Sequence, residues 1–515
     1  MVAAPHPLAA EAGLAVLREG GTAMDAAVAA NAVLTVVYPD QTAIGGDCFL
    51  LYHEAATGQT HAYNGSGRAP LAADRDALGA THGGRMPRQG IATVTVPGTV
   101  DAWDAALDRF GRLGLDRALR PAIALARDGF PVSPRLSAAI AAMPPTLVDN
   151  PALQAIFLPA GVVPSPDSLL PLPDLAASLD LIAREGRAAF YDGALAEAIG
   201  ATSERLGGAL AAGDLTAHRG EWVDPIAATY RGLTVLGFPP NSQGLTALLA
   251  LNLIERERPA PWGSTDGLHA QIEAKKLAFA VRDRTLADPA FVPQDPARLV
   301  SKTYAADLWR AYDPGRAAAG APSLAGDTVY LCAVDRDGNA ASLIQSLFQA
   351  FGSGVVADGT GIVLQNRGTS FSLAADHPNR LEPGKRPMHT LMPAMLLRDG
   401  ALLGPLGTQG GDAQAQVHLQ LIAAIADHGL HPQQAVDAPR WLAGGLATDP
   451  PTLVSLEAGF PAGTVAGLAA RNHTVRQVPA RNPHFGHAQV ILRDSARGVL
   501  LGGADPRADG SAVGY

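Results

Sequence analysis

Two neighbouring runs of the sequence, residues 328–334 and 340–347, are apolar on both of their alternating faces. A strand of this kind has to be covered on both sides, because water would otherwise meet apolar side chains on one face. The residues between the runs include Asp337-Gly338, and glycine permits the positive backbone angles that a tight hairpin turn requires. The sequence therefore predicts a central hairpin with one layer of structure above it and another below it.

Helical and strand patterns alternate on the N-terminal side of this hairpin. Alanine-rich helices are expected over residues 7–19 and 24–37, and residues 48–52 have the apolar pattern of a strand. The pattern is mostly helical from 131 to 257, and a long helix is expected from 266 to 287. The 515 residues, 47% of them hydrophobic, can bury a large core as one big domain or two modest ones. This mixture predicts an α/β (α+β) protein.

The segment just before the hairpin consists almost entirely of small residues. Residues 313–326 are rich in Ala, Gly, Pro and Ser, the composition of a flexible, exposed linker, which we place at about 313–327. One interpretation is a plain linker before a strand whose first residue, Thr328, is β-branched. The other is a self-cleavage site between Asp327 and Thr328. Cleavage there would give Thr328 a free amine, and an amine with a pKa of about 8 can act as base for the neighbouring hydroxyl nucleophile.

Composition and missing motifs exclude several classes of function. The net charge of −9 gives a nucleic acid no general reason to bind. Cys48 and Cys332, the only cysteines, are too few for a disulfide framework or a thiolate metal site. The sequence has no G-x-S-x-G, H-E-x-x-H or Walker motif, and its 14 histidines are scattered singly. We therefore expect a small-molecule substrate and no metal.

The N-terminal sequence bears on location. Residues 1–21 lack a positively charged segment followed by an apolar run, so we expect no secretion signal and a cytoplasmic protein. The hydrophobic stretch 26–37 is shorter than the roughly 20 residues needed to cross a bilayer. We therefore expect a buried helix there and no association with a membrane.

Short motifs occur in a fixed order along nearly the whole chain. Around Thr328 they are Asp-Arg-Asp-Gly-Asn at 335–339, Phe-Gly-Ser-Gly at 351–354 and Gly-Ile-Val-Leu-Gln-Asn at 361–366. The others are His6-Pro7-Leu8-Ala9, Gly20-Gly21-Thr22-Ala23, Ile44-Gly45-Gly46-Asp47, Val96-Pro97-Gly98, Pro239-Pro240, Pro383-Gly384-Lys385-Arg386-Pro387, Gly410-Gly411 and Asp505-Pro506-Arg507. In these motifs the chain resembles the gamma-glutamyltransferase family of N-terminal-nucleophile hydrolases.

The resemblance implies a four-layer αββα sandwich and a precursor that cuts itself into a large subunit, residues 1–327, and a small subunit, residues 328–515. Thr328 falls on the family's nucleophile, whose hydroxyl attacks first the Asp327 carbonyl and then substrate amides through an acyl-enzyme. Gly410 and Gly411 match the glycine pair whose N–H groups hold the tetrahedral oxyanion. Ser346 matches a hydroxyl residue near the nucleophile. No cofactor is implied, and a dimer of heterodimers is compatible with the family.

The groups that bind an amino acid's carboxylate and amine in this family are largely replaced. The family's arginine position holds Ser66, and Arg68 is displaced from it by two residues. The family's pair of serines is replaced by His389-Thr390, and Phe348 replaces an asparagine. The family's acidic position holds Ser370, beside Asn366 and Arg367. Loss of the acidic group removes an ion pair to a substrate ammonium, whereas Arg367 attracts a carboxylate. Glutathione is therefore a doubtful substrate.

These replacements resemble the branch that includes oxamate amidohydrolase and acylase-like members. The predicted activity is hydrolysis or acyl transfer of a small amide that bears a carboxylate. Its predicted binding residues are Arg68, Asn366, Arg367, His389 and Thr390. Three alternatives stay open: a true gamma-glutamyltransferase or glutathione hydrolase with a rearranged pocket, a biosynthetic carbon–carbon bond hydrolase of the same family, and an uncleaved binding protein without activity.

Overall fold

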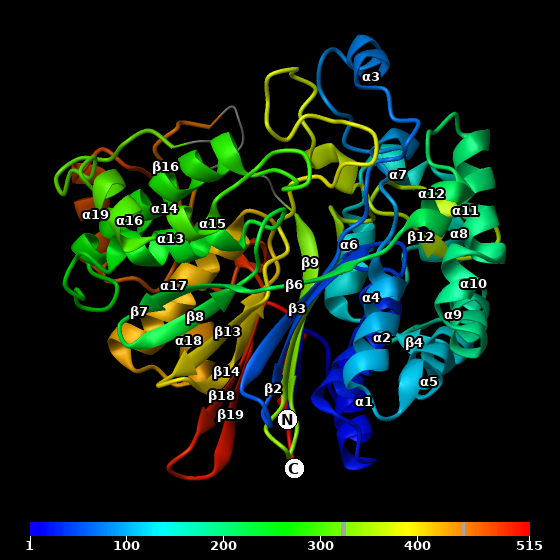
Figure 1. The fold of residues 1–515 in the computed structure, drawn as a ribbon, viewed down its shortest axis with the longest axis horizontal. Coiled ribbons are helices and arrows are strands. Elements are labelled where there is room, and N and C mark those ends of the chain that lie inside the picture. The colour runs from blue at the N-terminus through cyan, green and yellow to red at the C-terminus, as the bar shows by residue number, and fades with distance from the viewer. Residues whose placement is uncertain (321–325, 445–448) are drawn as a thin grey trace.

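Two antiparallel sheets lie face to face at the centre of the computed structural model (Figure 1), which describes residues 1–320, 326–444 and 449–515. The first sheet has the order β20 (Ser511–Val513), β1 (Val2–Ala4), β9 (Asp327–Val334), β10 (Ala340–Phe348), β2 (Asp47–Glu54), β3 (Gln59–Gly65) and β6 (Glu221–Val223). The second has the order β19 (Val499–Ala504), β18 (Ala488–Asp494), β14 (Ala401–Thr408), β13 (Ala394–Arg398), β8 (Leu233–Gly237) and β7 (Ile226–Tyr230). The predicted hairpin, β9 and β10, occupies the middle of the first sheet.

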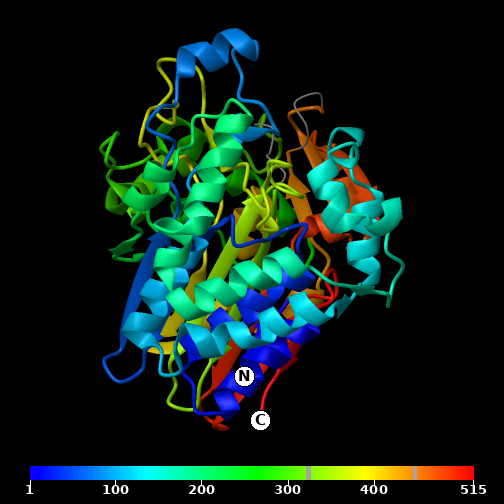
Figure 2. The ribbon, with the colours of Figure 1, turned by 90° about the vertical axis from the view of Figure 1, so that its right-hand side faces the viewer.

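Helices cover the outer face of each sheet (Figures 1 and 2). Over the first sheet lie α1 (Pro7–Arg18), α2 (Ala23–Val37), α4 (Thr99–Phe110), α5 (Gly114–Asp128) and α9 (Pro173–Glu185). Over the second lie α13 (Gly244–Ile254), α14 (Thr265–Thr285), α17 (Ala413–His428) and α18 (Pro432–Asp437). The molecule is thus a four-layer αββα sandwich, and the predicted fold class is confirmed.

The innermost core fills the space between the two sheets. Phe49 and Tyr330 from the first sheet and Met395 and Ile491 from the second are completely buried there. Cys48 and Cys332 are free, buried thiols, as expected of small core residues. Helix α2 is buried along its whole length, because it lies between the first sheet and the outer helices α1 and α5. The apolar pattern of the hairpin thus has the double cover that it required.

Shorter elements complete the chain. They are α3 (Arg75–Thr81), α6 (Pro134–Ala141), α7 (Pro145–Val148), α8 (Pro151–Phe157), α10 (Arg187–Tyr191), α11 (Ala194–Arg205), α12 (Ala212–Ala217), α15 (Pro296–Leu299), α16 (Lys302–Trp309), α19 (Ala462–Ala470), β4 (Phe130–Pro131), β5 (Leu169–Leu170), β11 (Val356–Ala357), β12 (Ile362–Val363), β15 (Trp441–Ala443), β16 (Leu453–Glu457) and β17 (Thr474–Val478). No helix in the described ranges is long and apolar enough to cross a membrane.

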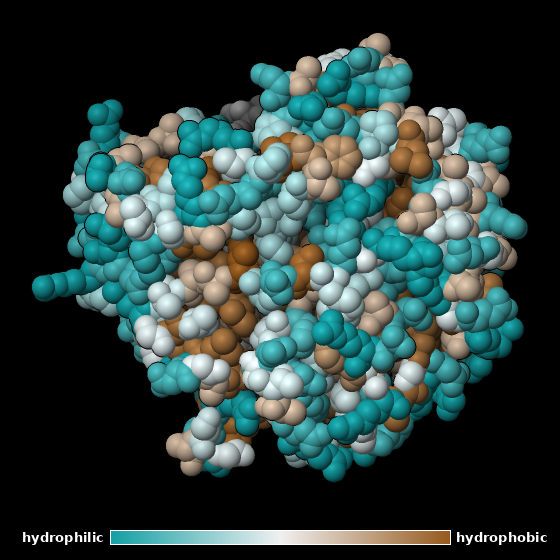
Figure 3. All heavy atoms as spheres, viewed as in Figure 1, coloured by the Kyte–Doolittle hydropathy of each residue, from teal (hydrophilic) through white to brown (hydrophobic). Residues whose placement is uncertain are grey.

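The pattern from 131 to 257 is less helical than expected. The short strands β6, β7 and β8 lie within it, and β8 pairs with β13, more than 150 residues further along the chain. Strands of three to five residues carry little periodicity of their own, so the sequence did not predict them. In Figure 3, hydrophobic side chains gather left of and below the centre, over β8 and β13.

Candidate active site

A β-bulge lies at the residue predicted to be the nucleophile. Gln345 pairs with Val329 and Phe348 pairs with Asp327, so β10 advances three residues while β9 advances two. Ser346 and Leu347 therefore face Thr328 together, and Phe348 takes a positive φ of 79°. Bulges of this kind re-aim side chains next to active sites. Here the bulge turns the Ser346 hydroxyl toward the bond between Asp327 and Thr328.

Hydroxyl groups connect Thr328 to the carbonyl group of Asp327. Thr328 Oγ1 donates to Ser346 Oγ at 3.1 Å, and Ser346 Oγ donates to the Asp327 carbonyl oxygen at 2.6 Å. Ser346 Oγ also accepts from the Phe348 N–H at 2.6 Å. The side chains of Thr328 and Ser346 are buried. A proton leaving the Thr328 hydroxyl thus has a direct path, through one serine, to the oxygen of the neighbouring peptide bond.

Replacing Ser346 by alanine is expected to slow cleavage of the precursor about 10- to 100-fold. The change removes the donor to the Asp327 oxygen and the acceptor for Thr328, and loss of one oxyanion donor commonly costs a few kcal/mol of barrier. A time course of intact and cut chains by denaturing mass spectrometry measures the rate. Ser346→Thr should restore much of it. Ser342→Ala, in the same strand but bonded to Tyr330 and Ala394, is the matched control, and equal slowing by both alanine variants would contradict the role.

Asp327 lies in an environment that disfavours its charge. Burial, together with the nearby Asp40, raises the pKa of its carboxyl to about 6, although Arg135, His484 and the Ala350 N–H oppose the rise. The Ala350 N–H donates to Asp327 Oδ2 at 3.0 Å. The folded precursor therefore holds a proton on this carboxyl more tightly than the unfolded chain does.

The contribution of Asp327 to the stability of the uncut chain should consequently fall as pH rises from about 4 to about 6 and then level off. Because the folded pKa is the higher one, the folded state binds more protons in that window, and Asp327 contributes about 1 to 3 kcal/mol to the change. Thermal unfolding of Thr328→Ala, compared with Thr328→Ala/Asp327→Asn, isolates this contribution. The double variant should lose that part of the pH dependence, and identical pH profiles would show that Asp327 does not titrate as described.

The glycine pair lies beside the predicted cut. A Cβ atom added to Gly326 would lie 3.1 Å from the Gly411 Cα, so the two backbones are in direct contact. Gly410 and Gly411 have positive φ angles of 127° and 56° and precede α17. Within the described ranges, no group accepts a hydrogen bond from either amide. Both N–H groups, at the positive end of a helix, are therefore available to an oxyanion.

A buried glutamine braces this glycine pair. Gln243 Nε2 donates to the carbonyl oxygens of Gly411 and Thr390, each at 3.0 Å. Its Oε1 accepts from Arg282 at 2.9 Å, and Arg282 is ion-paired with Asp412 at 2.6 Å. One amide thereby fixes the glycine pair and the predicted binding residue Thr390 relative to each other.

Arg367 is a completely buried cation with little protein compensation. Its Nη1 donates to Thr390 Oγ1 at 3.1 Å, and its guanidinium lies 4.1 Å from the centre of the Phe348 ring. Nε and Nη2 have no hydrogen-bond partner in the described part of the chain. Burial lowers the pKa of Arg367 to about 9, which nearby Asp47 offsets only in part. The two free donors, Nε and Nη2, lie on one edge of the planar guanidinium, and two parallel donors of this kind suit a carboxylate.

His389 is occupied by the protein on both ring nitrogens. Its Nε2 lies 3.0 Å from Asp47 Oδ2, and its Nδ1 accepts from the Leu391 N–H at 3.3 Å. Burial and Arg367 lower the pKa of His389 to about 3, so the ring is neutral at ordinary pH and donates from Nε2. The structure thus gives His389 a place beside Arg367 but a hydrogen-bond role toward Asp47.

Two other predicted binding residues also have their polar groups engaged. Asn366 bonds to Gln349 and to the carbonyl oxygen of Arg88 and so holds the loop after β10. Arg68 pairs with Glu221 at 3.0 Å and with Asp288 at 3.5 Å, and it donates to the Gly384 carbonyl. Of the five predicted residues, Arg367 and Thr390 are therefore the pair joined by a direct hydrogen bond.

Sequence reasoning missed three buried side chains of this region. With its amide turned so that both ends are satisfied, Gln41 donates to the Thr328 carbonyl oxygen at 2.8 Å and accepts from Arg135. Asp47 binds His389, and Gln243 braces the glycines. Asp47 and Gln243 lie in or next to motifs that the sequence did single out, Ile44-Gly45-Gly46-Asp47 and Pro239-Pro240. Their contacts span more than 140 residues, so spacing alone gave no signal.

The first part of the predicted linker is held by hydrogen bonds. His269 Nε2 lies 2.8 Å from the Asp313 carbonyl, and Glu273 and Lys276 bind the N–H and carbonyl of Ala318. His473 joins His269 at 2.8 Å, and these two histidines and Glu273 bring possible metal ligands within 4.8 Å. Because Lys276 already pairs with Glu273 at 2.8 Å, we interpret the cluster as an anchor for the segment. Residues 321–325 lie outside the described residues, so flexibility stays a prediction.

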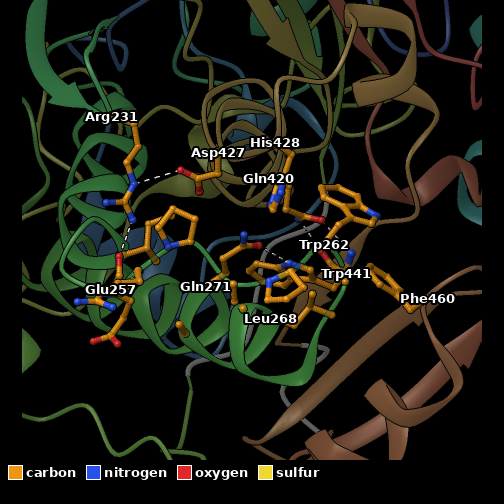
Figure 4. Close-up of a pocket in the computed structure, with 18 of the residues that line it drawn as sticks. Arg231, Glu257, Trp262, Leu268, Gln271, Gln420, Asp427, His428, Trp441 and Phe460 are labelled. Atoms are coloured by element: carbon orange, nitrogen blue, oxygen red, sulfur yellow. Dashed lines mark hydrogen bonds and ion pairs between the residues drawn. The ribbon is translucent and has the colours of Figure 1, made fainter.

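Two hollows differ in their relation to this site. A polar cavity of about 430 Å³ is lined by Arg85, Ser370, Phe371 and the ion pair of Arg282 with Asp412, next to Arg367 and Gly411. A smaller one, of about 60 Å³, lies in the outer helical layer among Trp262, Trp441 and Phe460 and contains none of the predicted site residues (Figure 4). The polar cavity is the one whose lining includes close sequence neighbours of the site, Thr369 near Arg367 and Asp412 after Gly411.

Known proteins match this chain over nearly its whole length. The family model described as gamma-glutamyltranspeptidase matches residues 9–515. The glutathione hydrolase-like YwrD proenzyme of Bacillus subtilis (strain 168) is 43% identical, with 100% of this chain and 98% of the relative covered. The oxamate amidohydrolase proenzyme of Klebsiella pneumoniae subsp. pneumoniae is 38% identical, with the same coverage. The crystal structure of cephalosporin acylase from Bacillus halodurans superimposes with a TM-score of 0.93 at 38% identity, covering 100% of this chain and 95% of that one.

These matches run over the whole chain and include proenzymes and a solved structure of the same fold. The chain is therefore an enzyme, an amidohydrolase proenzyme that cuts itself into a large and a small subunit. It belongs to the gamma-glutamyltranspeptidase family of N-terminal-nucleophile hydrolases.

Proposed function

We propose that Thr328 is the nucleophile both for cutting the precursor after Asp327 and for hydrolysing a small amide that carries a carboxylate. In the first reaction, the Thr328 hydroxyl attacks the Asp327 carbonyl carbon and passes its proton through Ser346 to the carbonyl oxygen. The C–N bond then breaks as the nitrogen takes up a proton, which leaves Asp327 joined to Thr328 by an ester. Water then hydrolyses the ester, which gives the Asp327 α-carboxyl group, restores the Thr328 hydroxyl beside its free amine and separates the two chains. The hydrogen bonds of 3.1 and 2.6 Å support this path.

The same hydroxyl serves the substrate reaction. The freed amine of Thr328, with a pKa of about 8, takes the hydroxyl proton as the oxygen attacks the amide carbon. The N–H groups of Gly410 and Gly411 stabilise the oxyanion, in an orientation fixed by Gln243. The amine of the substrate leaves with a proton, and water hydrolyses the acyl-enzyme. An added amine could replace that water, which would make the reaction a transfer.

The unpaired donors of Arg367 carry the substrate assignment. A buried guanidinium with two free nitrogens is costly unless an anion joins it. A substrate carboxylate would complete the arrangement with Thr390 and lie beside Phe348, which pairs with Asp327 in the ladder. An ammonium group would be repelled. This favours an oxamate-like or acyl amide over a γ-glutamyl donor, whose α-amine needs an acidic partner.

Steady-state rates with four classes of amide test the assignment on the processed enzyme. The panel comprises oxamate, longer carboxylate-bearing amides, neutral amides of matched size, and γ-glutamyl anilides. We expect the carboxylate-bearing amides without an α-amine to have kcat/KM values at least tenfold above the neutral ones. A strong and exclusive preference for γ-glutamyl donors would instead establish a gamma-glutamyltransferase with a rearranged pocket.

A further inference from the structure

An apolar pocket lies under α3, the helix that projects at the top of Figure 1. Its volume is about 170 Å³, and its walls include Ala73, Met86, Val94, Phe371 and Leu381. Asp74 is the one charged residue of its described lining, and the Asp74 carboxylate is engaged in capping α3 through the N–H groups of Asp76 and Ala77. An apolar cavity of about 150 Å³ in a protein can bind benzene, so this pocket has room for about six carbon atoms.

The pocket exists because small residues form much of its wall. Six alanines, Ala69, Ala72, Ala73, Ala77, Ala92 and Ala209, line it together with three glycines, Gly207, Gly208 and Gly368. Larger side chains at such positions would fill the space from within. The fold instead leaves an apolar volume that a ligand can occupy.

This pocket adjoins the polar cavity that is lined by Arg282 and Asp412. Met86 and Phe371 line both hollows, and Phe371 is 5% exposed. Gly368 directly follows Arg367 and forms part of the pocket wall. The side chain of methionine is flexible and adapts readily to a neighbouring ligand. One molecule could therefore place a carboxylate at Arg367 and an apolar group past Met86 and Phe371.

We propose that the substrate carries, beside its carboxylate, an apolar group of about six carbons that enters this pocket. The proposal rests on the proposed function, because it takes the carboxylate to lie at Arg367. Burial of each methylene is worth about a fourfold gain in affinity, so the apolar group sets the specificity among carboxylate-bearing amides.

Calorimetric titration of the processed enzyme with acetate, butyrate and hexanoate tests the pocket without any need for turnover. We expect the Kd to fall at least tenfold from acetate to hexanoate. Ala73→Phe should fill the pocket and remove this difference while leaving acetate binding unchanged. Ala80→Phe, at an exposed position of the adjacent helix α3 and outside the pocket lining, is the matched control and should keep the difference.

Two results would overturn the proposal: equal affinity for the three carboxylates, or a chain-length effect that Ala73→Phe leaves intact. Failure of the underlying carboxylate site looks different, because Arg367→Leu would then leave the binding of acetate and hexanoate unchanged. The carboxylate site is supported if Arg367→Leu loses affinity for both acetate and hexanoate. The apolar pocket is supported if the wild-type protein shows the chain-length effect and Ala73→Phe does not.

Discussion

Thr328→Ala is expected to give a single uncut chain of 515 residues with no amidase activity. The variant stays uncut because it lacks the hydroxyl that cuts the precursor. The wild-type protein, which has that hydroxyl, should give two chains, residues 1–327 and 328–515. The same change removes the nucleophile of turnover, so activity should fall below what a steady-state assay detects. Denaturing mass spectrometry gives the chain masses, and N-terminal sequencing of the smaller chain gives the cut site.

Thr328→Ser separates loss of the hydroxyl from loss of the side chain's shape. Serine keeps the hydroxyl, so this variant should still cut and turn over, though more slowly because it lacks the methyl group that packs in the buried site. A smaller chain that begins at any position other than 328 would contradict the assignment. So would a Thr328→Ala protein that still yields two chains.

Arg367→Leu is expected to lower kcat/KM for carboxylate-bearing amides about 30- to 1,000-fold. Charge-assisted bonds from a buried guanidinium contribute about 2 to 4 kcal/mol, and leucine supplies neither charge nor donors. Neutral amides of the same size should lose little, since they make no ion pair. Arg367→Lys should have a kcat/KM for carboxylate-bearing amides between those of the wild-type enzyme and Arg367→Leu, because an ammonium keeps the charge but lacks the planar fork.

Arg68→Leu is the matched control for this prediction. Arg68 was also predicted to bind substrate, but it is ion-paired with Glu221 and Asp288 and is partly exposed. Its loss should change kcat/KM less than threefold. If Arg68→Leu costs as much as Arg367→Leu, the carboxylate lies elsewhere. Both variants should still cut themselves, which shows that they fold.

Local patterns were sufficient for much of the fold. The helices α1 and α2 and the central hairpin lie within one or two residues of the predicted ranges, because each has a strong periodicity and α2 has a capping box at Thr22 and Asp25. Strands β6 to β8 escaped prediction because they are short and gain their stability from partners far along the chain. The four layers followed from the family resemblance and not from periodicity.

The candidate site divides in the same way. The resemblance singled out Thr328, Ser346 and the glycine pair. In the structure, Ser346 is hydrogen-bonded to Thr328, and Gly326 is in contact with Gly411. It could not distinguish the arginine with free donors from the one in ion pairs, because that difference depends on Glu221 and Asp288, distant in sequence from Arg68. Gln243 likewise acquires its role only when 147 and 168 residues of intervening chain bring its partners to it.

The sheet order has a consequence for what the cut can change. Strand β1 of the large subunit lies between β20 and β9 of the small subunit, β10 pairs with β2, and β13 pairs with β8. The two products therefore share both sheets and cannot part without exposing the interior. Dissociation of this heterodimer therefore requires its unfolding. Subunits from different molecules would consequently not exchange in the native state. Proteolytic maturation thus leaves two chains that are covalently separate but form a single folded body.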